Sequence, residues 1–193
     1  MLAVDERGEI VDGDQIIAAL ALDLEVDAVA VTSMTNLGFH RLLAEHGIAV
    51  HTTDVGDRYV LEALAREGAV LGGEQSGHVI DLSRGTTGDG PMTAVALFSI
   101  AARTKRTLHD LASDLAVYPQ VLVNVRVADK AIADHPDVRH AIAAAERELA
   151  GDGRINVRPS GTEPLVRVMV ESSDRDRTHA IANMVADTVR RLG

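Results

Sequence analysis

The sequence predicts an α/β protein, with one α/β/α domain built on a small mixed or parallel sheet followed by an α+β domain built on a mostly antiparallel sheet. Between residues 28 and 72, short apolar runs alternate with amphipathic helical patterns that end at glycines, which is typical of a parallel sheet covered by helices. After Tyr118-Pro119 this alternation stops, and a turn-linked pair of strands appears between two helical patterns.

The distribution of charge marks the same boundary. Residues 1–119 carry 18 acidic and 8 basic side chains, whereas residues 120–193 carry 11 of each, so the first segment holds the whole formal charge of -10. Such a shift is typical of a junction between two independently packed units. We therefore expect a short hairpin over residues 1–12, a first domain over 13–112, a linker over 113–119 and a second domain over 120–193.

Each element of the first domain has its own signal. Residues 1–11 alternate around a glycine-containing turn, which predicts a β-hairpin, and a helical pattern then starts at residues 12–14 with Asp14 as its expected N-cap. The remaining expected elements are strands over 28–32, 49–53 and 70–72, and helices over 36–46, 57–67 and about 91–102.

The second domain is expected to contain strands over 120–128, 154–158 and 165–171, together with a helix over 136–149. A last amphipathic helix is indicated by apolar residues at helical spacing, which are Ile181, Met184, Val185, Thr188 and Leu192. Helices on one face of a small antiparallel sheet form an α+β domain.

Composition excludes several classes of function. The chain has no cysteine, so disulfide frameworks, thiolate zinc sites, iron–sulfur clusters and cysteine nucleophiles are ruled out. Only 2% of the residues are aromatic and the net charge is negative, which argues against a nucleic-acid partner. No apolar run approaches the roughly 20 residues that cross a bilayer, and no secretion signal is evident, so we expect no membrane insertion and a cytoplasmic location.

The first polar loop that could carry chemistry is Gly73-Glu74-Gln75-Ser76-Gly77-His78, at the end of a predicted strand. Open α/β sheets place their ligands at such strand ends. Glu74, Ser76 and His78 would point one way if the segment were extended, and a carboxylate beside a hydroxyl suits paired sugar hydroxyls. The alternative is a tight turn whose polar side chains simply meet solvent.

The second loop is Arg158-Pro159-Ser160-Gly161-Thr162-Glu163-Pro164, followed by Arg167 in the next strand. Two hydroxyls, a glycine that exposes backbone N–H groups and two fork-shaped guanidinium groups can cradle a phosphate dianion. The alternative is a plain hairpin whose surface arginines pair with Glu163 and Glu171.

Other polar residues favour structural roles. In Thr86-Thr87-Gly88-Asp89-Gly90, Asp89 precedes a helix and is expected to cap it. Asp12-Gly13-Asp14 likewise enters a helix and has no third ligand nearby in the sequence, so we predict no metal site there or elsewhere in the chain. The histidines other than His78 form no metal-binding spacing and are expected to be solvated or buried in the core.

Four segments follow one another along the chain: Val55-Gly56-Asp57-Arg58-Tyr59-Val60, Gly73-Glu74-Gln75-Ser76-Gly77-His78, Thr86-Thr87-Gly88-Asp89-Gly90 and Arg158-Pro159-Ser160-Gly161-Thr162-Glu163-Pro164. In order and spacing they resemble the third and fourth domains of the α-D-phosphohexomutases, and Gln75 favours the phosphoglucosamine mutase branch of that family. The resemblance covers the whole chain. It implies a four-domain enzyme with a central cleft, in which residues 13–112 would bind the sugar and residues 120–193 would bind phosphate.

The resemblance also implies roles for individual residues. The sugar would be bound by Gly73, Glu74, Ser76 and His78, and the phosphate that is not transferred would be bound by Arg158, Ser160, Gly161, Thr162 and Arg167. Cleft support would come from Gly56, Asp57, Arg58 and Asp89. No catalytic residue and no metal ligand would lie in this chain, because the phosphoserine motif (Thr-Ala-Ser-His-Asn-like) and the magnesium loop (Asp-Gly-Asp-x-Asp-Arg) of the family do not occur in it.

The resemblance further implies an isomerase of amino-sugar and peptidoglycan-precursor metabolism, which interconverts glucosamine 6-phosphate and glucosamine 1-phosphate through glucosamine 1,6-bisphosphate with magnesium as cofactor. The chain resembles its C-terminal half, inactive by itself, with residues 1–12 left from the second domain and the missing N-terminal half as partner. A diadenylate cyclase partner follows from the family alone. The alternatives are another phosphohexomutase, such as a phosphomannomutase/phosphoglucomutase, or a stand-alone sugar-phosphate-binding or regulatory docking module.

Overall fold

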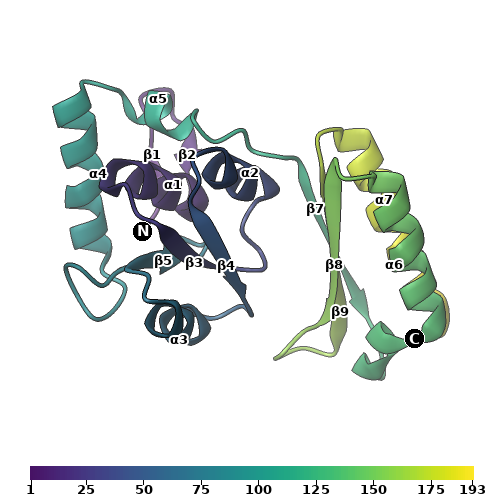
Figure 1. Cartoon of the computed structure of the whole chain (residues 1–193). Helices are drawn as coiled ribbons and strands as arrows, with labels where there is room; N and C mark the ends of the chain where they lie inside the picture. Colours follow the sequence, from purple (N-terminus) through teal and green to yellow (C-terminus); the bar gives the residue numbers. More distant parts are fainter. The chain divides into compact units, whose positions relative to one another are not determined.

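A computed structural model describes all residues, 1–193, and divides the chain into two compact units, Met1–Val117 and Tyr118–Gly193. Each unit is described by itself (Figure 1). No helix in either unit has both the length and the apolar character that a bilayer span requires.

The first unit contains a four-stranded sheet and a separate two-stranded hairpin. Its elements are β1 (Ala3–Val4), β2 (Ile10–Val11), α1 (Gly13–Leu24), β3 (Ala28–Thr32), α2 (Leu37–Glu45), β4 (Ala49–Thr53), α3 (Asp57–Glu67), β5 (Leu71–Gly73), β6 (Val79–Asp81), α4 (Gly90–Thr104) and α5 (Leu108–Ala112). The sheet order is β4-β3-β5-β6, in which β3 is parallel to β4 and β5 while β6 is antiparallel to β5. The predicted α/β class with a mixed sheet is confirmed.

The two faces of this sheet bury different side chains. Val29 and Val31 of β3 pack in the core beneath α1 and α2, whereas Ala30 between them packs with Val60 and Leu64 of α3. This alternation follows from the two-residue period of a strand. Figure 1 accordingly shows α3 on the opposite side of the sheet from α1 and α2.

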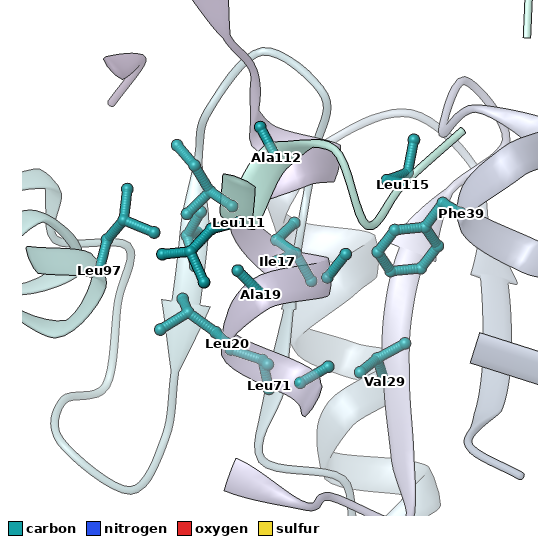
Figure 2. Packing of buried hydrophobic residues seen from close by; sticks show 14 of the residues in the cluster. Ile17, Ala19, Leu20, Val29, Phe39, Leu71, Leu97, Leu111, Ala112 and Leu115 are labelled. Atoms are coloured by element: carbon teal, nitrogen blue, oxygen red, sulfur yellow. The ribbon is translucent and has the colours of Figure 1, made fainter. Parts of the chain in front are cut away.

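The larger core lies around α1, as Figure 2 shows. Ile17 and Leu20 point toward Leu71 of the sheet, Leu97 of α4 and Leu111 of α5, while Phe39 of α2 closes the other side. Helix α1 contacts strand β5 and the helices α2, α4 and α5. These contacts fix the position of α1 in the domain.

The start of α1 differs from the expectation in one respect. Asp12, not Asp14, is the N-cap, because its Oδ1 accepts a hydrogen bond from the Gln15 N–H at 3.1 Å and the Gln15 side chain returns a bond to the Asp12 N–H at 3.0 Å. Asp14 is buried, and its Oδ2 accepts from the N–H of Asn36 at 2.8 Å. The prediction of Asp14 as N-cap is therefore wrong, since Asp14 instead ties α1 to the start of α2.

The predicted hairpin over residues 1–11 forms as β1 and β2, and Asp5 holds it. The Asp5 Oδ1 atom accepts bonds from the N–H groups of Arg7 and Glu9, and Oδ2 lies 3.0 Å from His109 Nδ1 of α5. Burial raises the pKa of Asp5, whereas the hydrogen bonds from Glu9, His109 and Arg7 lower it. The hydrogen bonds together outweigh burial, so the pKa of Asp5 lies below its ordinary value. His109 is thus an ion-pair partner of the hairpin.

This attachment should weaken in acid. A carboxyl group whose pKa is lower in the folded state stabilises that state above its unfolded pKa of about 4, and the stabilisation is lost as the pH falls through the folded value. We therefore expect the NMR resonances of Ala3 and Val4 to move toward unfolded positions as the pH is lowered below 4. In Asp5→Asn the same resonances should show no such titration, and a titration that survives in this variant would contradict the assignment.

The second unit is an α+β sandwich of one sheet and one helical layer. Its elements are β7 (Gln120–Arg126), η1 (Lys130–Asp134), α6 (Pro136–Leu149), β8 (Gly153–Pro159), β9 (Leu165–Ser172) and α7 (Arg175–Leu192). The strand order is β7-β9-β8, and both pairings are antiparallel. Figure 1 shows α6 and α7 on one face of this sheet, where Val166, Val168 and Val170 form the core with Ile181 and Val185.

Candidate functional site

A cavity of about 460 Å³ opens at the carboxyl ends of the parallel strands in the first unit. Thr32 ends β3, Val55 follows β4 and Glu74 follows β5, so each parallel strand delivers residues to the same edge of the sheet. Its lining consists of Leu2, Ile10, Asp12, Thr32, Met34, Val55, Glu74, Gln75 and Ser76. This position is where open α/β sheets hold their ligands, and we name it the strand-end cavity.

The loop of residues 73–78 is a tight turn between β5 and β6, not an extended segment. The Glu74 N–H donates to His78 O at 3.0 Å, and the Gly77 N–H donates to Glu74 O at 2.9 Å. Gly73, the last residue of β5, pairs with Val79 across the sheet. Consequently the predicted alternation breaks down, and Glu74, Gln75 and Ser76 line the cavity together.

Glu74 is oriented by the backbone that precedes α3. Its Oε1 accepts a hydrogen bond from the Gly56 N–H at 3.1 Å, which fixes the carboxylate at the cavity edge. Ser76 is exposed and its hydroxyl faces solvent at the rim. The structure therefore joins Gly56 to Glu74 by a hydrogen bond, and Glu74 and Ser76 both line the cavity.

His78 lies away from the cavity lining. Its Nε2 is 3.6 Å from Asp57 Oδ2 at the start of α3 and is buried without a hydrogen-bond partner. The ring packs against Gly88, where an added Cβ would lie 2.9 Å from the His78 Cδ2 atom, so a side chain at residue 88 would require the imidazole to move. His78 thus joins the first turn of α3 to the loop before α4.

The residues expected to support the cleft are placed by helix ends. Asp89 is the N-cap of α4, because its Oδ1 accepts from the Met92 N–H at 2.9 Å, and its predicted capping role is confirmed. Arg58 is exposed and pairs with Glu62 one turn later in α3 at 2.7 Å, and this bond raises the pKa of Arg58. Arg58 therefore has a surface partner and does not line the strand-end cavity.

The loop of residues 158–164 connects β8 to β9 in the second unit. The Ser160 N–H donates to Leu165 O at 2.9 Å, and the buried Ser160 Oγ accepts from the Glu163 N–H at 3.4 Å. Gly161 and Thr162 are exposed at the tip, and an added Cβ at Gly161 would meet no atom within 4 Å. The tip therefore has open space beside its backbone, as close approach of a ligand requires.

Two arginines lie side by side next to this tip. Arg158 of β8 and Arg167 of β9 are direct cross-strand partners, and Asn124 of β7 faces Arg167 from the other side. Since Val166 and Val168 point into the helical layer, Arg167 and its partners lie on the face of the sheet opposite the helices. This juxtaposition places two guanidinium groups where one anion could reach both.

Part of the alternative hairpin hypothesis is also realised. Arg167 Nη2 lies 3.3 Å from Glu163 Oε2, and Glu171 pairs with Arg154. The Arg167 Nε atom is buried without a hydrogen-bond partner. Sequence reasoning missed Lys130 of η1, whose Nζ donates to Ser160 O at 2.8 Å and adds a third cation to the loop.

Several carboxylates of the first unit lie close to other potential metal ligands. Asp12 and Asp14 serve the two helix starts, as described above. Asp5, Glu9 and His109 do bring one potential ligand atom each within 4.8 Å of one another. Sequence spacing could not reveal this group, because His109 lies about 100 residues from the two carboxylates.

A second hollow in the first unit, of about 510 Å³, lies among α1, α2, α4 and α5. Its charged rim is already paired: Arg106 Nη2 lies 2.7 Å from Asp114 Oδ1, and Asp23 pairs with Arg103. In the strand-end cavity, by contrast, neither Asp12 nor Glu74 has an ion-pair partner. The unpaired charges therefore favour the strand-end cavity as the ligand site.

Comparisons with known proteins agree with this architecture. Residues 12–118 match the model of phosphoglucomutase/phosphomannomutase alpha/beta/alpha domain III, and residues 122–188 match the C-terminal domain of the same family. The chain is 49% identical over 198 residues to a phosphoglucosamine mutase of Heliobacterium modesticaldum and 54% identical over 198 residues to one of Frankia alni. These matches cover 100% and 99% of this chain but 43% and 42% of the relatives, so the chain spans less than half their length.

Solved structures show the same fold. The N-acetylphosphoglucosamine mutase of Aspergillus fumigatus, crystallised with GlcNAc-6P and magnesium, superimposes with a TM-score of 0.82 at 22% identity, covering 100% of this chain and 46% of that chain. A phosphoglucomutase/phosphomannomutase family protein of Burkholderia thailandensis gives a TM-score of 0.78 at 20% identity, covering 98% and 44% of the two chains. Because family models match most of its length, the chain belongs to the phosphoglucomutase/phosphomannomutase family.

Proposed function

We propose that this chain is the substrate-recognition half of a cytoplasmic phosphoglucosamine mutase, which interconverts glucosamine 6-phosphate and glucosamine 1-phosphate through a bisphosphorylated intermediate. The observation that carries this proposal is the strand-end cavity, where Glu74, Gln75 and Ser76 converge. Their segment resembles the phosphoglucosamine mutase branch, and relatives that are about half identical over the whole chain bear that name: 49% in Heliobacterium modesticaldum and 54% in Frankia alni.

The chain contributes binding and orientation. Glu74, fixed by the Gly56 N–H, accepts hydrogen bonds from sugar hydroxyls, and Ser76 adds a hydroxyl that can donate or accept. Holding the sugar in one orientation lowers the entropic barrier to a reaction that another part of the protein performs. Arg158, Arg167 and the N–H of Gly161 hold the phosphate that is not transferred, with Ser160 and Thr162 as hydroxyl partners.

Magnesium would neutralise charge that develops during phosphoryl transfer. The group of Asp5, Glu9 and His109 at the hairpin does not fit that ion. Magnesium prefers octahedral oxygen ligands and retains several waters, whereas the three-residue group at the hairpin contains an imidazole whose Nδ1 is 3.0 Å from Asp5 Oδ2. We propose that the metal is held by a part of the enzyme outside this chain.

The proposal can be tested by restoring the missing part. The 193-residue chain should show no conversion of glucosamine 6-phosphate, whereas joining it to the N-terminal half of the Frankia alni relative should restore conversion. Turnover by the chain alone would contradict the recognition role. The joined protein would be assayed in its folded state with magnesium present. A preference for mannose phosphate over glucosamine phosphate would contradict the proposed substrate.

The phosphate-binding role predicts a weak effect within this chain. Charge-assisted hydrogen bonds contribute roughly 1.5–3 kcal/mol each before ordering and desolvation costs. Inorganic phosphate at millimolar concentration should therefore shift the amide resonances of residues 158–163. Arg158→Lys should weaken this binding severalfold, because a point charge does not reproduce a guanidinium fork. Arg190→Lys on α7 is the matched control. If both variants lose the same phosphate affinity, the effect of Arg158 is general electrostatic attraction and not specific binding.

A further inference from the structure

The strand-end cavity is acidic, and none of the side chains that line it is basic. Its ionisable lining residues are Asp12 and Glu74, and no lysine, arginine or histidine lines it. The other polar groups are the Gln75 amide and the hydroxyls of Thr32 and Ser76. Two carboxylates beside one hollow repel a phosphate and attract a cation.

Each carboxylate keeps one oxygen available. Asp12 uses Oδ1 to cap α1, and Glu74 uses Oε1 to accept from the Gly56 N–H. The opposite oxygens, Asp12 Oδ2 and Glu74 Oε2, make no hydrogen bond or ion pair within the chain, and neither does the amide of Gln75. An ammonium group has three donors and no acceptor, so it matches two carboxylate oxygens and one amide oxygen.

The loop and the start of α1 are locked together, which keeps Asp12 beside the sugar-binding residues. The Gly13 N–H donates to Gln75 O at 2.9 Å. An added Cβ at Gly13 would lie 2.8 Å from Gly77 N and 2.9 Å from Gln75 O, so the backbones are already in close contact. Asp12 is therefore built into the cavity by the same contact that positions Gln75.

We propose that Asp12, together with Gln75 and Glu74, recognises the protonated 2-amino group of the sugar phosphate and so selects amino sugars over neutral and N-acetylated hexoses. This inference rests on the proposed function and adds the residue that determines specificity. Asp12 thus has two tasks, because one oxygen caps a helix while the other faces the ligand. An N-acetyl group would remove the positive charge and leave the carboxylates unbalanced.

The test measures selectivity in the 193-residue chain. Dissociation constants for glucosamine 6-phosphate, glucose 6-phosphate and N-acetylglucosamine 6-phosphate would be obtained at pH 6 and low salt from the amide resonances of residues 12, 13 and 73–77. The phosphate is common to all three ligands, so the ratio of constants isolates the substituent at position 2. We expect the chain to favour the amine on the order of tenfold, as one charge-assisted hydrogen bond allows.

Asp12→Asn should bring this ratio close to one, because asparagine caps a helix as well as aspartate but carries no charge. Glu45→Gln removes the same charge from the end of α2, outside the cavity, and should keep the tenfold preference. Should Asp12→Asn fold poorly by circular dichroism, Asp12→Ser supplies a second uncharged cap.

Equal affinity of the wild-type chain for all three sugars would overturn the inference while leaving mutase activity of the joined enzyme intact. Absence of binding by any sugar phosphate at residues 73–77 would overturn it as well. A third contrary result concerns metal ions. If magnesium chloride shifts the amide resonances of residues 12 and 74 at a lower concentration than glucosamine 6-phosphate does, the two carboxylates form a metal site and not an amine site.

Discussion

Replacing Glu171 with alanine is expected to destabilise the second unit by about 3–5 kcal/mol, because it removes one partner of a buried ion pair. Glu171 is fully buried, pairs with Arg154 and accepts a hydrogen bond from Gln120 Nε2 at 2.9 Å. The alanine variant leaves the Arg154 charge without its carboxylate. A loss of this size is a large share of the stability of a small domain.

The effect can be measured by urea denaturation followed through the NMR signals of β7 and β9. Breaking the exposed pair of Arg190 with Asp187 by Arg190→Ala is the matched control and should cost less than about 1 kcal/mol. The double variant Arg154→Met with Glu171→Leu should recover most of the stability, since it removes both charges together. If Glu171→Ala behaves like the exposed control, then the ion pair does not hold the three strands together.

Replacing Gly13 with alanine is expected to disrupt the strand-end cavity more than any single change to a polar residue there. Alanine is the best helix former, so the substitution would favour α1 if the helix stood alone. In the folded chain its Cβ would lie 2.8 Å from Gly77 N and closer still to Glu74 O. The loop of residues 73–78 must then move, at a cost of about 1–3 kcal/mol.

Sugar-phosphate binding at residues 73–77 should fall at least tenfold in Gly13→Ala, because Glu74 and Gln75 lose their positions. Gly85→Ala is the control: its Cβ would meet nothing closer than 3.4 Å and its φ is not positive. Thermal melting and the NMR titration with glucosamine 6-phosphate report the two effects separately. Unchanged binding by Gly13→Ala would show that the loop is not held by α1.

Much of the fold could be predicted from local patterns. The strands over 28–32 and 49–53 and the helix over 57–67 match β3, β4 and α3, because apolar periodicity and glycine stops coincide there. The three-residue strand β6 and the five-residue helix α5 were missed, since such short elements show no full period. Their existence depends on pairing with β5 and packing against α1, which are tertiary effects.

The candidate site was predictable only in part. Glu74 and Ser76 could be selected from residue type and strand-end position, and both line the cavity. Asp12 could be interpreted only as part of a helix start, because the loop that places it at the cavity lies about 60 residues away in the sequence. The position of His78 could not be predicted either. Its contacts with Asp57 and Gly88 depend on the turn between β5 and β6, whereas the sequence predicted an extended segment with alternating side chains.

We propose that the first unit binds the amino sugar and that the second unit binds phosphate. The most direct test of both roles is a titration of the isotopically labelled 193-residue chain with glucosamine 6-phosphate, with every amide resonance followed. We expect shifts to concentrate at residues 12–13, 73–77 and 158–163, and we expect inorganic phosphate to reproduce only the last group. Shifts centred on the hollow around His46 and Arg106, with residues 73–77 and 158–163 unmoved, would contradict both roles.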